Sequence, residues 1–442
     1  MKRKISISTT VTLVLLAIAL TVSLTMLLAM RHFNNQLQLV GERQAMYYYI
    51  DDVEKVVREY YPNLTPEMLR PGIAQGYADS TGDRYADYYT PQQFVEEQLR
   101  LSGKANDVGV VLGLDAENRV VVSYVHANSA ADKVGVKAGD VVVSLDSVSV
   151  EGRSLSELQN QVNAASKLLL TVRHGDSIHD TSFEMSAFEY AVRSVRDTMI
   201  GTIGHIKITA FYENTADQFK ATVSALIEQG ATGLVFDLRN NAGGSPEAVQ
   251  EMLSYVMPLG AYGTMTDPKG NVTKLSTKAS HQLDLPTVTL INGSTYGEAE
   301  FFAGVLQEAQ LTTVMGQTSA GKAKYQQYFV LEQDYSALKL TVGEYGLIKG
   351  GSWQDKGITP NEAVTLPPEQ EAIQTLLSPH EDAQVQAAVT KLVETVEVPM
   401  GGNTDVGNTT GTTTGGEDAD GSTTAGDTTD ADVTTTTTAK ED

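Results

Sequence analysis

Residues 287–304 of the chain read TVTLINGSTYGEAEFFAG, and residues 319–326 read SAGKAKYQ. The first five residues are Thr, Val, Leu and Ile and predict a buried strand, whereas residues 298–309 have the pattern of a helix. Gly, Ser and Thr fill the turn between them, and acidic residues at the start of the helix suit its positive end. This stretch therefore predicts a strand, a glycine-containing turn and a helix, followed by a loop that carries Lys322.

Strands and helices also alternate on either side of this stretch, from about residue 190 onward. Residues 203–208 and 233–238 predict strands, and residues 215–228 predict a helix between them. Alternation of this kind predicts a sheet covered by helices, an α/β core over residues 190–370.

The region before this core, residues 104–188, has a different pattern of short strands with one helix. Strands are expected at 108–114, 119–126, 141–145, 168–173 and 181–185, and an amphipathic helix at 154–165. These elements predict a compact mixed domain of about 80–90 residues, within the usual range of domain sizes.

The N-terminal part begins with a basic segment, residues 1–8, followed by an apolar run over residues 9–30. About 20 apolar residues cross a bilayer as a helix, and the preceding Lys2, Arg3 and Lys4 predict an N-terminus on the inner side. A membrane anchor is the favoured interpretation, and a cleaved signal peptide is the alternative. Residues 33–103 predict helices, with a stop at Pro62 and a new start at Pro91.

Composition excludes several classes of function. The formal net charge is −23, which disfavours nucleic-acid binding, and the chain has no cysteine, which excludes disulfides and thiolate chemistry. The seven His residues show no metal-ligand spacing, so no metal or cofactor is expected. A helical segment is expected over residues 371–400, and the Thr-, Gly- and Asp-rich residues 401–442 are expected to be a disordered tail.

Three motifs of the chain resemble those of the carboxyl-terminal processing, or tail-specific, serine peptidases. The family places its nucleophile in a run Asn-x-x-x-x-Ser-x-x-Glu, with Gly-Lys-x-x-x-Gln after the next helix. Asn292, Glu300 and Lys322 each count to the same position for that serine, and the residue there is Gly297. The resemblance implies a Ser-Lys-Gln type of endopeptidase in which the nucleophile is missing.

The resemblance also assigns roles to the residues around Gly297. Lys322 would be the general base, kept neutral by burial, and Gln326 would orient it. Residues 237–244, DLRNNAGG, match the family loop beside the serine, so backbone N–H groups of Gly243, Gly244 and Glu298 are candidates for the oxyanion hole.

Two questions about this site stay open from the sequence. Glu298 stands where the family has a small residue; its carboxylate either pairs with Lys322 and keeps it protonated, or faces solvent in the first turn of the helix. Ser294, Thr295 and Ser319 lie nearby, but a displacement of two or three residues moves a hydroxyl by several ångströms, since consecutive Cα atoms are about 3.8 Å apart.

Residues 129–141, SAADKVGVKAGDV, resemble the turn before the central strand of the family's PDZ domain. Such domains bind a chain terminus as an added strand and hold its carboxylate on backbone N–H groups. Val108, Gly109 and Val110 would form that loop here. Asp107 stands where the family often has Gly, and it either weakens carboxylate binding or is only a strand-entry residue.

The expected fold is thus an α/β protease core, described as a crotonase-like sheet-and-helix core, with an inserted PDZ domain, an N-terminal helical segment and a transmembrane helix. Two functions remain: an endopeptidase that cuts exported proteins near their C-termini, or an inactive relative that binds or regulates. Partners would be polypeptide C-termini or unstructured proteins, with a homodimer as a further option. The expected location is the cell membrane, single-pass, with the bulk of the chain extracytoplasmic.

Overall fold

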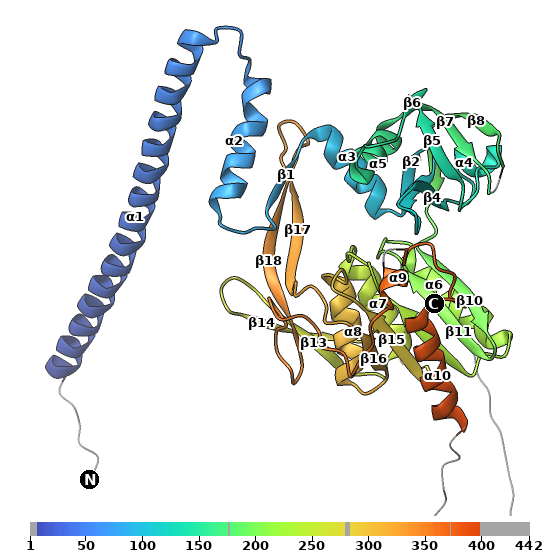
Figure 1. Cartoon of the computed structure of the whole chain (residues 1–442). Helices are drawn as coiled ribbons and strands as arrows, with labels where there is room; N and C mark the ends of the chain where they lie inside the picture. Colours follow the sequence, from blue (N-terminus) through green and yellow to red (C-terminus); the bar gives the residue numbers. More distant parts are fainter. Residues whose placement is uncertain (1–6, 176, 279–282, 372, 398–442) are drawn as a thin grey trace, which may run out of the picture. The chain divides into compact units, whose positions relative to one another are not determined.

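The computed structural model describes residues 7–175, 177–278, 283–371 and 373–397 (Figure 1). Its first helix, α1 (Ile7–Tyr60), is continuous over 54 residues and ends just before Pro62, as the sequence predicts. The apolar segment Val11–Asn34 within it has 24 residues and a mean hydropathy of 2.6, and none of it is buried. This helix is long and apolar enough to cross a membrane, a test that a signal sequence near an N-terminus also passes. The predicted segment 1–8 lies mostly, and the predicted tail 401–442 entirely, outside the described residues.

Two helices and a short strand follow α1: α2 (Pro66–Ser80), β1 (Asp87–Tyr89) and α3 (Pro91–Leu101). Thr90 and Gln93 cap α3 reciprocally, each side chain accepting the backbone N–H of the other. The prediction that residues 33–103 are helical is wrong at β1, because this segment pairs with a distant strand, Asp87 opposite Lys339.

A six-stranded antiparallel sheet with two helices forms the next region, in the order β3-β4-β5-β7-β8, with β6 paired to β5 beside this path. Its elements are β3 (Val110–Leu114), β4 (Val120–Val125), α4 (Ala130–Val134), β5 (Val141–Leu145), β6 (Val148–Ser149), α5 (Leu155–Ala164), β7 (Lys167–Arg173) and β8 (Asp180–Ser186). Leu145, Leu158 and Leu170 are fully buried in its core. A separate ribbon of β2 (Lys104–Asp107) and β9 (Phe188–Ala191) precedes and follows these elements in the chain.

The α/β core is built on a six-stranded sheet in the order β10-β11-β12-β15-β16-β19, and every pair except β10–β11 is parallel. Its strands are β10 (Val195–Ile200), β11 (Ile203–Ile208), β12 (Gly233–Asp237), β15 (Thr287–Ile291), β16 (Thr313–Gly316) and β19 (Glu362–Ala363). Its helices are α6 (Thr215–Glu228), α7 (Pro246–Val256), α8 (Glu298–Glu308), α9 (Pro368–Glu371) and α10 (Ala383–Glu397). The predicted alternation of strands and helices is confirmed, whereas the comparison with crotonase-like cores stays a prediction.

Both faces of this sheet are buried, as expected for mostly parallel strands. Phe236 on one face packs among Phe219 of α6 and Phe302 of α8, with ring centroids 5.4 and 6.0 Å away. On the other face, Val235 shares a cluster with Leu392 of α10. The central strands are therefore held rigidly, and so are the loops that leave their carboxyl ends.

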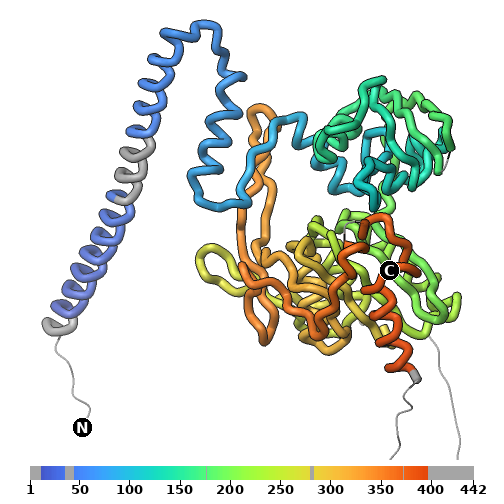
Figure 2. The backbone as a smooth tube through the Cα atoms, in the orientation of Figure 1, coloured from blue at the N-terminus to red at the C-terminus, as the bar shows by residue number. Residues whose placement is uncertain are grey.

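A second sheet, which the sequence did not reveal, contains β13 (Ala261–Thr266), β14 (Val272–Ser276), β17 (Lys324–Val330) and β18 (Ala337–Leu347), with β1 at one edge. Strands β17 and β18 form a long antiparallel hairpin, the orange pair of Figure 2. The loop that carries Lys322 leads directly into β17, so this sheet positions the predicted base.

Candidate functional site

Two loops meet at the carboxyl ends of the adjacent parallel strands β12 and β15, and hydrogen bonds join them. Asn292 Oδ1 accepts the N–H of Asn240 (3.0 Å), and Asn292 Nδ2 donates to Asn240 Oδ1 (2.8 Å). Tyr296 N–H donates to the carbonyl of Asn241 (2.9 Å). Open α/β sheets bind ligands at this end of the strands. The DLRNNAGG loop therefore lies beside the turn that carries Gly297.

Gly297 has a backbone conformation that strongly favours glycine. Its φ is 61° and its ψ is −121°, immediately before the first residue of α8. A Cβ atom at this position would have only one heavy atom within 4 Å, the Cδ of Lys322 at 3.9 Å. A side chain at 297 would therefore fit the available space and point at Lys322. The backbone dihedral angles of that residue would, however, be strained.

Glu300 joins the Gly297 turn to the Lys322 loop. Its side chain is fully buried and accepts backbone N–H groups from Gly297 (3.0 Å), Gly321 (2.6 Å) and Lys322 (2.7 Å). The hydroxyl of Ser319 donates to it as well (2.6 Å). One carboxylate thus fixes the positions of the two segments whose side chains would have to meet.

Lys322 lies in a partly buried site lined by two aromatic rings. Its Nζ donates to Gln326 Oε1 (2.7 Å) and lies 4.9 and 4.8 Å from the ring centroids of Tyr85 and Tyr296. Gln326 Nε2 in turn donates to the carbonyl of Tyr85 (2.5 Å). Burial lowers the pKa of Lys322 below 10.5, although the charge of Glu298 acts in the opposite direction.

This environment makes a prediction for stability. Lys322→Met should raise the melting temperature near neutral pH, with a gain on the order of 1 kcal/mol, because it removes a partly desolvated charge. The folded protein releases the Lys322 proton more readily than the unfolded chain, so the penalty is complete below the lowered pKa of Lys322 and fades as pH rises toward 10.5. Thermal unfolding followed by circular dichroism at several pH values measures this.

The matched control is Lys324→Met in the adjoining strand. Lys324 pairs with Glu344 at 2.5 Å, so its loss removes an ion pair and should give no gain. A fall in stability for Lys322→Met at neutral pH would show that the Gln326 hydrogen bond and the two rings outweigh the burial of the charge.

Glu298 fills the space in which the sequence predicted an oxyanion hole. Its side chain is 9% exposed, and Glu298 Oε2 accepts the N–H of Gly244 (3.1 Å). Burial raises the pKa of Glu298, and this effect is larger than the opposing effects of the Gly244 N–H and of the Lys322 charge. The N–H of Gly243 is bound by Asn241 Oδ1 (2.8 Å), so it is not free to donate to a substrate. The N–H of Gly244 therefore already binds a carboxylate, and the N–H of Gly243 already binds an amide.

This arrangement differs from both alternatives that the sequence left open for Glu298. The side chain does not face solvent. Within the described residues, no ion pair of 4.0 Å or less joins it to Lys322, which it influences only through its charge. The sequence missed this placement because the bond to Gly244 joins residues 54 positions apart.

The three nearby hydroxyls are engaged elsewhere or exposed. Thr295 Oγ1 donates to the carbonyl of Leu238 (3.0 Å), and Ser319 Oγ binds Glu300 and accepts the N–H of Ile358 (2.6 Å). Ser294 is exposed. Within the described part of the chain, none of the three hydrogen-bonds to Lys322 Nζ.

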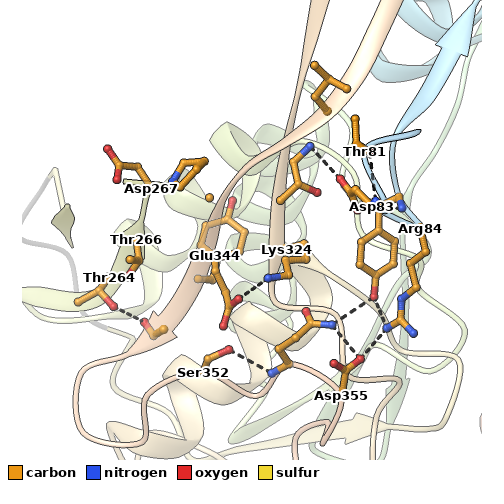
Figure 3. Close-up of a pocket in the computed structure, with 18 of the residues that line it drawn as sticks. Thr81, Asp83, Arg84, Thr264, Thr266, Asp267, Lys324, Glu344, Ser352 and Asp355 are labelled. Carbon is orange, nitrogen blue, oxygen red and sulfur yellow. Dashed lines mark hydrogen bonds and ion pairs between the residues drawn. The ribbon is translucent and has the colours of Figure 1, made fainter. Parts of the chain in front are cut away.

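The predicted site residues of the core other than Gly297 line one hollow of about 590 Å³, namely Gly243, Gly244, Glu298, Lys322 and Gln326. A larger groove of about 970 Å³ lies between the loop at residues 81–85 and strands of the second sheet. Figure 3 shows its ion pairs, with Arg84 facing Asp355 (2.7 Å) and Lys324 facing Glu344 (2.5 Å). Because Tyr85 lines this groove and also contacts Lys322, the two hollows flank the same lysine.

Asp237 and Arg239 of the DLRNNAGG motif belong to a buried charge cluster. Asp237 accepts from Arg239 (2.6 Å) and Lys207 (3.0 Å), and Arg239 pairs with Asp382 (2.9 Å) next to α10. Burial alone raises the pKa of Asp237, but Arg239 and Lys207 hold it well below 3.8. These residues hold α10 onto the core, and no sequence pattern marked Lys207 or Asp382 for this role.

The predicted carboxylate loop of the smaller domain also contains a carboxylate of its own. Val108 is fully buried, and Gly109 has a φ of 83°. Asp107 Oδ1 accepts the N–H of Gly109 (2.7 Å) and the hydroxyl of Tyr190 (2.7 Å). Asp107 is therefore more than a strand-entry residue, because its side chain turns into the loop.

Comparison with known proteins agrees with this fold. Residues 202–364 match the model of peptidase family S41, and residues 121–173 match a PDZ domain. The carboxy-terminal processing protease CtpB of Bacillus subtilis (strain 168) is 26% identical over 330 residues, covering 72% of this chain and 68% of that protein. CtpA of the same organism is 28% identical over 322 residues, covering 71% and 68%. A putative S41 protease from Bacteroides fragilis has the same fold, with a TM-score of 0.53 and 16% identity over 72% of this chain and 88% of that one.

The chain therefore contains a peptidase family S41 domain together with a PDZ domain, and the resemblance inferred from the motifs is confirmed. Its relatives are carboxy-terminal processing proteases. The roles of individual site residues stay predictions.

Proposed function

We propose that this chain is a membrane-anchored pseudoprotease, which has the architecture of a carboxyl-terminal processing protease but binds polypeptides without cleaving them. The observation that carries the proposal is the direction of the missing side chain at Gly297. A Cβ there would face Lys322, and Lys322 Nζ is hydrogen-bonded to Gln326 and, among the residues that the structure describes, to no serine hydroxyl. Without a hydroxyl in that direction, the base has nothing to activate and no acyl-enzyme forms.

The occupied oxyanion site supports the same proposal. A tetrahedral intermediate needs backbone N–H donors aimed at its oxyanion. Here the N–H of Gly244 is bound by the carboxylate of Glu298. A second negative charge in that position would be repelled as well as left without donors.

The anchor rests on the apolar segment Val11–Asn34 and the basic residues before it, with the bulk of the chain on the extracytoplasmic side. Binding rests on the PDZ domain, since such domains add an extended polypeptide to a sheet edge. The partner would be an exported or unstructured protein.

The unaltered full chain, purified in detergent, should release no fragments from fluorescently labelled unfolded casein above the level of Lys322→Ala. The alternative is an active serine endopeptidase that uses another hydroxyl. Cleavage by the unaltered chain that is lost in Lys322→Ala would establish this alternative, and Ser294→Ala would then be the first variant to examine.

A further inference from the structure

The edge of the PDZ sheet is closed by one side chain. Strand β3 is the edge strand, with β4 on its other side. On the free edge, Gln159 of α5 donates to the carbonyl of Val110 (3.1 Å) and accepts the N–H of Leu112 (2.7 Å). These are backbone groups that an added strand would use, so a rotation of the Gln159 carboxamide opens the edge to a peptide.

At the end of that edge, the carboxylate of Asp107 disfavours binding of a negatively charged group. The N–H of Gly109 lies in the turn where a ligand carboxylate is expected, and it already donates to Asp107 Oδ1. Tyr190, which is 5% exposed, donates to the same oxygen. Gly109 also packs closely against Ser129, since a Cβ built on Gly109 would lie 2.1 Å from that of Ser129.

Neither His126 nor Tyr190 brings a positive charge to Asp107. Burial lowers the pKa of His126, although the charge of Asp107 raises it, so the imidazole is mainly neutral at neutral pH. Burial and the hydrogen bond to Asp107 raise the pKa of Tyr190, which stays a neutral donor. A ligand carboxylate in this turn would thus meet a like charge and an N–H that is already bound.

We propose that this PDZ domain takes an internal extended segment of a polypeptide and rejects a free carboxyl terminus. The inference rests on the proposed binding role of the domain and specifies its ligand. Pairing with Val110 and Leu112 needs only backbone groups, which every internal segment offers. The Asp107 carboxylate penalises an end that carries its own negative charge.

Three fluorescent peptides with one apolar sequence test this: one with a free α-carboxylate, one with a C-terminal amide, and one extended by further residues. Fluorescence anisotropy with the full chain in detergent gives a Kd for each. The amide and the extended peptide should bind on the order of tenfold or more tightly than the free acid. Equal or tighter binding of the free acid would overturn the inference and leave the binding role intact.

Two variants test separately the charge of Asp107 and its hydrogen bond to the Gly109 N–H. Asp107→Asn keeps an acceptor for Gly109 and Tyr190 but removes the charge. It should therefore reduce the difference in Kd between the free-acid peptide and the amide peptide. Asp107→Gly combined with Tyr190→Phe frees the Gly109 N–H without leaving a buried hydroxyl, and it should shift the preference toward the acid. If the ratio of the Kd of the free acid to that of the amide were unchanged in both folded variants, a role for Asp107 would be contradicted.

Gln159→Ala should tighten binding of all three peptides by a similar factor, because it removes the competitor for the strand edge. Gln161→Ala is the matched control, since Gln161 lies on the same helix and bonds Arg153 and Asp146 instead. If no peptide binds to the unaltered chain or to Gln159→Ala, the binding role and the selectivity both fail.

Discussion

The double variant Gly297→Ser with Glu298→Ala should cleave unfolded casein at a rate on the order of 10³-fold or more above the unaltered chain. The serine supplies a hydroxyl directed at Lys322, and the alanine removes the carboxylate from the N–H of Gly244. Adding Lys322→Ala should abolish the gain. The measurement is the initial rate of fragment release by the purified full chain.

The single variants divide this gain between its two causes. Gly297→Ser alone should be weaker than the double variant by on the order of 10²-fold, the usual effect of losing one oxyanion donor. Gly297→Ala is the control for backbone strain, because it adds the Cβ without the hydroxyl and should stay inactive. A folded double variant that remains inert would show that more than the nucleophile and its oxyanion site has been lost.

Glu300→Ala should lower the free energy of unfolding by on the order of 4 kcal/mol or more, the largest effect on stability that we expect. Three backbone N–H groups and the hydroxyl of Ser319 converge on this fully buried carboxylate. Alanine would leave all four donors without an acceptor, and each buried unsatisfied donor costs about 1–3 kcal/mol. Denaturant unfolding followed by fluorescence measures the change. The free energy of unfolding of Glu300→Gln should lie between those of the unaltered chain and Glu300→Ala.

Glu298→Ala is the matched control, since the two glutamates lie in the same turn of α8. Glu298 accepts one backbone N–H from another segment, and burial raises its pKa above 4.5. The raised pKa means that its ionised form weakens the fold, and this penalty grows as pH rises through the interval above 4.5. Its removal should therefore cost little, or stabilise the protein at neutral pH. Equal losses for the two variants would contradict the distinct roles assigned here.

The sequence was most informative where spacing alone carries the information. Counts from Asn292, Glu300 and Lys322 lead to Gly297, and a Cβ built at that position would lie 3.9 Å from Lys322 Cδ. Alternating apolar strands and helices predicted the central sheet, because parallel strands buried on both faces have a strong pattern.

The parts that the sequence did not reveal depend on contacts between distant residues. Tyr85 supports Lys322 and Gln326 from 241 positions before the glutamine, and no local pattern marks it. Strand β17 is exposed or half-buried along its whole length, so it lacks the alternation that identifies a strand. The direction in which Glu298 and Asp107 point is likewise a matter of tertiary structure.

The backbone at position 297 also has an evolutionary consequence. At a φ of 61° and a ψ of −121°, any residue with a Cβ is strained by on the order of 1–3 kcal/mol, whereas glycine is relaxed. An ancestor with serine here would have become more stable by losing its nucleophile, and a descendant would have to give up that stability to regain it. Selection for folding alone would therefore favour glycine at this position unless catalysis itself is under selection.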